Sequence, residues 1–231
     1  MTEAMTDKIA VIAGGSPEVA EATARLLARR GAAGLLVCGR GAERGQALAA
    51  IISAAGCPTR FLPVDLARAQ DCAAVIAEAD VAFGRIDVLI VGAGEVPSLP
   101  LAETPPEKLD QLLAVKVRAP FLLLHGAAGL MRRTRTYGTM IIMIGGSGGN
   151  GPRTLAAVAG KGALAAMARG FADTLAADHI QVFGLALDDE RAGVTAPPAE
   201  AAYTIAELAA GSSDNPSGAI IEFAQGSVPA E

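Results

Sequence analysis

The sequence has no tryptophan, and only 3% of its 231 residues are aromatic. Its three cysteines, Cys38, Cys57 and Cys72, are odd in number and have no metal-binding spacing, so we expect reduced, mostly buried thiols and no metal ion. Acidic residues outnumber basic ones by 24 to 19, which argues against a nucleic-acid partner. No uncharged apolar run is long enough to cross a bilayer, and no secretory signal precedes the first apolar run. We therefore expect a cytoplasmic protein that binds neither nucleic acid nor a membrane.

Small and aliphatic residues dominate instead, since 52% of the chain is hydrophobic and 27 residues are glycine. The length is sufficient for one α/β domain, and no change in composition marks a second. Strands are expected at 8–13, 34–38, 59–63, 86–92, 139–144, 180–187 and 218–224, and helices at 18–30, 42–55, 68–83, 105–132, 154–177 and 198–210. This alternation predicts a single Rossmann-like domain over residues 1–231, with a doubly wound parallel sheet and helices on both faces.

The first strand-to-helix turn, VIAGGSPEVA, has features of a dinucleotide-binding turn. Glycines there let the backbone approach a pyrophosphate, which lies at the helix N-terminus. Gly14 and Gly15 meet this requirement, but Glu18 and Ala20 stand where two further glycines are expected. A carboxylate in the first helical turn is itself stabilised by about 0.3–1 kcal/mol, which gives Glu18 a structural interpretation. The same charge is expected to repel pyrophosphate.

Together with this turn, later segments resemble the short-chain dehydrogenase/reductase family along essentially the whole chain. The segments that carry the resemblance are VDL (64–66), IDVLIVGAG (86–94), LLAVKVRAPFLL (112–123), IIMIGGSGG (141–149) and AVAGK (157–161). The resemblance implies a nicotinamide cofactor contacted by Gly14, Gly15, Ser16, Arg40, Asp65, Leu66, Gly92, Ala93, Gly94 and Lys161. Arg40 resembles the residue that favours a 2′-phosphate, so NADP(H) is expected if a cofactor binds. The alternative is a solvated loop arginine.

The positions that carry catalysis in the family are altered here. The family's tyrosine hydroxyl is its general acid and base, but the corresponding Ala157 has no proton to transfer, although Lys161 remains. Gly146 stands in register with the family's catalytic serine, and Ser147 follows one place later, where a role in the glycine-rich turn is the alternative. A helix asparagine of the family is replaced by Lys116. These changes predict impaired oxidoreductase chemistry.

Two further segments depart from the family pattern. Val91 and Gly92 replace two asparagines after the fourth expected strand. The long insert that covers the substrate in the family is reduced to a short lid at 188–199. Together with Glu18, these departures predict that binding of NADP(H) is weak or lost.

Three functions remain open. The first is a pseudo-enzyme or non-catalytic partner subunit, and the second is an NADP(H)-dependent oxidoreductase that acts on a carbonyl or alcohol with a substitute proton donor. The third is a pocket in which Lys116 and Lys161 hold an anionic or carbonyl ligand, since two neighbouring ammonium groups lower each other's pKa. The alternative for Lys116 is a side chain that extends to solvent.

Small residues are unusually frequent in the expected helix 154–177. A helix that is apolar on most sides must be covered on most sides, and small side chains allow a close approach. In this fold that helix and the preceding long one commonly form a four-helix bundle. We therefore expect a homo-oligomer, dimer or tetramer, or an assembly with an active relative. His125, on the preceding apolar helix, is expected in the core.

Overall fold

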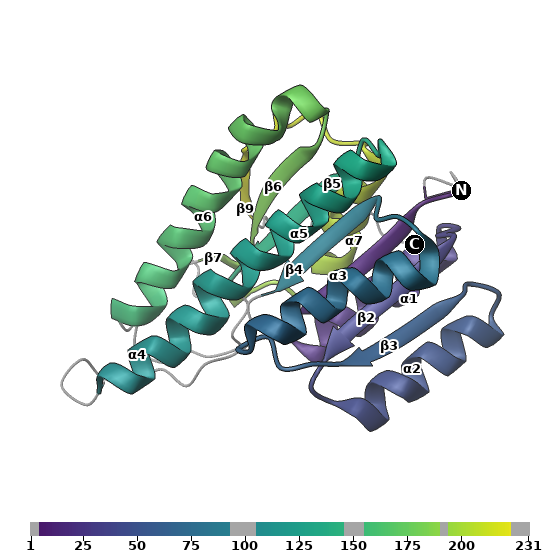
Figure 1. Cartoon of the computed structure of the whole chain (residues 1–231), viewed down its shortest axis with the longest axis horizontal. Helices are drawn as coiled ribbons and strands as arrows, with labels where there is room; N and C mark the ends of the chain where they lie inside the picture. The colour runs from purple at the N-terminus through teal and green to yellow at the C-terminus, as the bar shows by residue number, and fades with distance from the viewer. Residues whose placement is uncertain (1–4, 93–104, 146–154, 190–193, 223–231) are drawn as a thin grey trace.

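A computed structural model describes residues 5–92, 105–145, 155–189 and 194–222 of the chain (Figure 1). Its main sheet has seven strands in the order β3-β2-β1-β4-β5-β6-β9, and every pairing within it is parallel. The strands are β1 (Ile9–Gly14), β2 (Gly34–Gly39), β3 (Thr59–Pro63), β4 (Val88–Gly92), β5 (Thr139–Ile144), β6 (Gln181–Ala186) and β9 (Ile220–Glu222). The doubly wound parallel sheet expected from the sequence is thereby confirmed.

Helices cover both faces of this sheet. They are α1 (Pro17–Arg29), α2 (Ala42–Ala54), α3 (Ala69–Phe83), α4 (Pro106–Leu113), α5 (Ala119–Thr134), α6 (Leu155–Leu175) and α7 (Pro198–Ala210). Buried residues of α1, α2 and α7 pack on one face, and those of α3, α5 and α6 pack on the other. A single-turn 3-10 helix, η3 (Ala176–Asp178), follows α6.

Each strand contributes to both faces because successive side chains alternate across a sheet. In β1, Val11 and Ala13 join the core beneath α3, α5 and α6, whereas Ala10 and Ile12 join the core beneath α1, α2 and α7. Strands that are buried on both faces have nearly continuous apolar sequences. This is why short apolar runs located the strands of this sheet.

The segment expected as one helix at 105–132 is a continuous rod with a π-helical turn, η2 (Ala114–Arg118), between α4 and α5 (Figure 1). The N–H of Ala119 bonds to the carbonyl of Ala114, five residues earlier, which is the π-helical pattern. The next residue, Pro120, has no N–H and so cannot donate to the carbonyl of Lys116. Within the described part of the chain, this rod alone has the length and apolar composition of a membrane span. Its α5 portion belongs to the hydrophobic core, as in core helices of soluble proteins, so this is weak evidence for a span.

Within the segment expected as a short lid, 188–199, β7 (Asp188–Asp189) and β8 (Val194–Thr195) pair as an antiparallel ribbon. Residues 190–193 of the lid lie outside the described chain. His125 is exposed rather than in the core, because the buried face of α5 carries Leu123, Leu124 and Ala127.

Candidate functional site

The carboxyl ends of β1, β2 and β3 surround a cavity of about 330 Å³. Ligands of open α/β sheets bind at this edge, close to the point where the strand order reverses, here between β1 and β4. Val115 of η2 contributes to the opposite wall, and Arg118 ties η2 to the β3–α3 connection by donating to the Ala67 carbonyl at 2.5 Å. Glu21, Arg40, Arg44 and Asp65 are the charged side chains of the lining.

Several residues that the sequence nominated for a cofactor meet at this cavity. Those in the lining are Gly14, Gly15, Arg40, Asp65 and Leu66. Three nominated residues, Ala93, Gly94 and Ser147, lie outside the described chain. The exposed side chain of Arg40 follows β2, and Asp65 follows β3, where its Oδ1 accepts a hydrogen bond from the Ala67 N–H at 3.0 Å. The arrangement suits the nucleoside end of a dinucleotide.

The turn between β1 and α1 lies directly against the end of β4. Gly14 and Gly15 have positive φ angles, +76° and +90°, and the Gly15 N–H donates to the Gly92 carbonyl at 3.0 Å. A Cβ on Gly92 would lie 2.4 Å from the Gly15 Cα and 2.6 Å from the Met143 Cε. Gly92, which the sequence suggests as a cofactor contact and as a departure from the family pattern, is therefore required for this close approach.

A side chain at position 92 is expected to destabilise the fold. Gly92→Ala must displace backbone atoms of the β1–α1 turn, and overpacking of this kind costs about 1–3 kcal/mol. The matched control is Gly39→Ala at the end of β2, where an added Cβ has no neighbour within 4 Å. Urea unfolding followed by circular dichroism measures both changes. Equal stability of the two variants would contradict the close approach.

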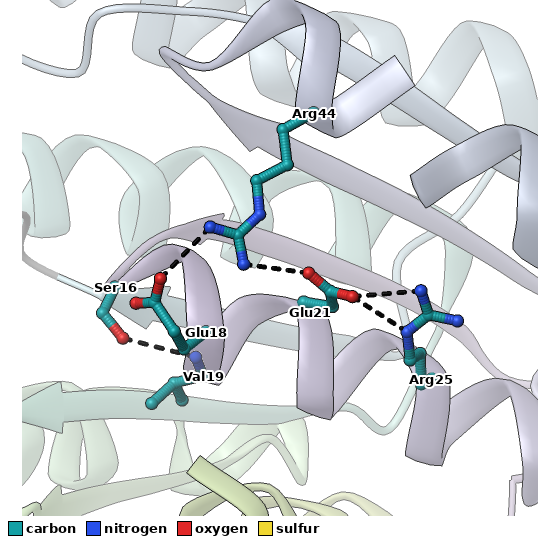
Figure 2. A network of polar contacts seen from close by, with 6 residues as sticks. All are labelled: Ser16, Glu18, Val19, Glu21, Arg25 and Arg44. Atoms are coloured by element: carbon teal, nitrogen blue, oxygen red, sulfur yellow. Dashed lines mark hydrogen bonds and ion pairs between the residues drawn. The ribbon is translucent and has the colours of Figure 1, made fainter. Parts of the chain in front are cut away.

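The Glu18 carboxylate is held by a network between α1 and α2 (Figure 2). Arg44 on α2 donates from Nη1 to the Glu18 Oε1 at 3.1 Å and from Nη2 to the Glu21 Oε2 at 3.0 Å. Arg25 donates to the other Glu21 oxygen at 3.0 and 3.1 Å. A hydrogen bond from its own backbone N–H, and next the one from Arg44, lower the pKa of the Glu18 carboxyl. Glu18 therefore remains charged at neutral pH.

Part of the first turn of α1 is unavailable to an anion. Pro17 has no N–H, and the Val19 N–H donates to the Ser16 Oγ at 3.3 Å. The Val19 N–H is one of the donors that a helix N-terminus offers to an anion. The site thus fits the nucleoside end of a nicotinamide dinucleotide but does not fit its pyrophosphate.

Arg44 and Glu21 are not predicted by any pattern in the sequence. They lie 23 residues apart on different helices, and Arg44 is 26 residues from Glu18. Only the placement of β1 and β2 side by side brings the first turns of α1 and α2 together. The signal available in the sequence is limited to acidic residues on α1 and a basic residue at the start of α2.

The two candidate catalytic lysines belong to neighbouring segments. Lys161 lies on α6 and Lys116 in η2, and both are half-buried. A Cβ on Gly160 would lie 3.3 Å from the Lys116 Cβ, so the aliphatic stem of Lys116 packs on α6 next to Lys161. Position 157, which is alanine, lies one turn before Lys161 on the same helix.

The two tyrosines of the chain lie elsewhere. Tyr137 precedes the amino end of β5, is 75% exposed, and packs edge-on against His179 with ring centroids 5.4 Å apart. Tyr203 of α7 packs under the guanidinium of Arg30, which follows the last residue of α1. Both lie away from the carboxyl edge of the sheet.

The cysteines are free and buried, as expected. Cys38 lines the cavity, but burial raises the pKa of its thiol well above the ordinary value. A thiol is nucleophilic as its thiolate, so Cys38 is a poor nucleophile.

Comparison with known proteins agrees with this fold. The family model for short chain dehydrogenases matches residues 8–193. The chain is 28% identical over 190 residues to an uncharacterized oxidoreductase of Thermotoga maritima, covering 81% of this chain and 72% of that protein. It is 29% identical over 188 residues to mouse (Mus musculus) L-fucose dehydrogenase, covering 81% and 62% of the two chains. It is 38% identical over 104 residues to cis-4-hydroxycyclohexanecarboxylate dehydrogenase of Sinomonas cyclohexanicum, covering 45% and 41%.

Solved structures give the same result. A metagenomic short-chain oxidoreductase in complex with NADP is 28% identical, with a TM-score of 0.80 over 94% of this chain and 97% of that one. A short-chain type dehydrogenase/reductase from Mycobacterium marinum has a TM-score of 0.84 at 22% identity, covers 97% of each chain, and shows the fold alone. Since the family model spans most of the sequence, the chain belongs to the short-chain dehydrogenase/reductase family.

Proposed function

We propose that this chain is a catalytically impaired member of its family, which keeps the fold and a ligand cavity but does not reduce carbonyls by the family's mechanism. The observation that carries the proposal is alanine at position 157, one turn before Lys161, with both tyrosines at other places. A general acid must lie within hydrogen-bond reach of the reacting oxygen, and alanine has no proton to donate. Lys161 is left without the hydroxyl that it assists in relatives.

In this proposal the chain acts as a partner subunit that binds either a second copy of itself or an active relative. The outward face of α6 includes exposed Arg169 and Asp173 together with four small exposed residues: Ala159, Gly162, Ala166 and Gly170. Beside it on α5, Phe121 is 47% exposed and packs edge-on against Phe171 with ring centroids 5.7 Å apart. Small residues flanked by an exposed aromatic ring suit close packing of another helix pair.

A second candidate is an NADP(H)-dependent oxidoreductase with a substitute proton donor. It is favoured by Arg40 in the cavity lining and by the NADP bound to the metagenomic relative. The packing of Lys116 on α6 beside Lys161 also supports the third candidate, a lysine pocket for an anionic or carbonyl ligand.

Oxidation of NADPH and NADH with a panel of aldehydes and ketones tests the proposal. We expect no turnover above that of buffer, with an active family member as the positive control. Turnover by the wild type that is lost in Lys161→Ala would contradict the proposal and favour the second candidate.

A further inference from the structure

We propose that the cavity binds a nucleoside monophosphate as its complete ligand, with the phosphate on the 2′ or 3′ edge of the ribose received by Arg40 and Arg44. In this proposal, Glu18 selects against ligands that carry a 5′ diphosphate. This ligand class rests on the proposed function in one respect, namely that the ligand is bound and is not reduced.

The α1 N-terminus carries its own anion. Glu18 places a carboxylate in the first turn of the helix, and the Ser16 Oγ accepts the N–H of Val19. A diphosphate at this position would lose this donor and would face a carboxylate that stays ionised at neutral pH. The Gly15 N–H is also used, by the Gly92 carbonyl. Selection against the diphosphate therefore comes from charge and from hydrogen bonds that are already made.

The remainder of the cavity suits a base and a ribose. Val37, Leu48, Phe61 and Val115 supply apolar wall for a planar ring. Asp65 can accept a hydrogen bond from an exocyclic amine in addition to the one from Ala67, because a carboxylate accepts several. The volume of about 330 Å³ is at the low end of the roughly 300–1,000 Å³ found for small-molecule sites, which suits a mononucleotide.

Arg44 is placed to exchange partners. Arg44 lines the cavity, its side chain is half-exposed, and its two terminal nitrogens each hold a different carboxylate. The same two nitrogens can hold one phosphate bidentately. When Arg44 turns to a phosphate monoester, Glu21 keeps its hydrogen bonds from Arg25. Glu18 is half-exposed and is then hydrated. Arg40 adds a second positive charge beside the same ligand group.

Titration calorimetry with adenosine, 5′-AMP, 2′-AMP, 3′-AMP and NADP⁺ tests the proposal on the wild type. We expect either the 2′ or the 3′ ester to bind at least about tenfold more tightly than adenosine, as befits a charge-assisted contact. We expect 5′-AMP to bind no better than adenosine, because its phosphate faces the closed turn of α1. NADP⁺ should bind within about threefold of 2′-AMP, since its second half adds nothing.

Variants assign these effects to residues. Arg44→Ala should weaken the monoester at least about tenfold and leave adenosine unchanged. Arg60→Ala is the matched control, because Arg60 is an exposed arginine that pairs with Glu78 and does not line the cavity. Glu18→Ala, and Glu18→Gln with its size retained, should raise the affinity for NADP⁺ relative to 2′-AMP at least about tenfold. Thermal melts monitored by circular dichroism confirm that each variant is folded.

Three results would overturn the inference. They are wild-type binding of NADP⁺ at least about tenfold tighter than of 2′-AMP, monoesters that bind no better than adenosine, and an Arg44→Ala variant with unchanged monoester affinity. NADPH oxidation with a carbonyl substrate would instead contradict the proposed function. Failure of one proposal is thus read by calorimetry and failure of the other by turnover.

Discussion

Ala157→Tyr is expected to restore little carbonyl reduction, with a rate at least about 100-fold below that of an active family member. A general acid contributes about 10²–10⁴-fold only when the reacting oxygen is held within its reach. The resemblance to the family implies that the Glu18 carboxylate occupies the pyrophosphate position and that Lys116 stands in place of an asparagine. The new hydroxyl therefore has no positioned cofactor and carbonyl to serve. Steady-state oxidation of NADPH with saturating carbonyl substrate measures the effect.

Ala157→Phe is the matched control, because it adds the same ring without the hydroxyl. A triple change that adds Glu18→Gly and Lys116→Asn to Ala157→Tyr should exceed the single variant, because it reopens the cofactor loop as well. Activity of Ala157→Tyr alone at the level of an active relative would show that neither Glu18 nor Lys116 is an obstacle. Borohydride trapping of a carbonyl ligand on Lys116 or Lys161 would instead favour the lysine pocket.

Ala166→Glu is expected to separate the proposed assembly into single chains. Ala166 lies on the outward face of α6, in the row of small residues that is to contact the second subunit. Each interface would bury a carboxylate without a partner, which costs about 3–5 kcal/mol and weakens association at least about 100-fold. Sedimentation velocity over a range of protein concentrations measures the change.

The matched control for the assembly is Ala73→Glu, an exposed alanine on α3, outside the α5–α6 surface. It adds the same charge and should leave the sedimentation coefficient of the wild type unchanged. A wild-type chain that sediments as a monomer, and with which no relative co-purifies from its native host, would contradict the partner-subunit role.

The sequence by itself determined the order and type of the elements in the main sheet. Apolar runs predicted its strands, because strands buried on both faces of a parallel sheet are apolar throughout. The two glycines of the β1–α1 turn were equally plain, since they occupy one place in a local pattern.

Only the tertiary structure decided what surrounds these positions. The contact of Arg44 with Glu18 and Glu21 requires β1 and β2 to be neighbours, and the steric need for Gly92 requires β4 to lie on the other side of β1. The outward orientation of His125 follows from which side of α5 meets the sheet. Periodicity within a short window encodes a helix or a strand. Contacts between different βα units depend on the order of strands in the sheet, which no short window of sequence contains.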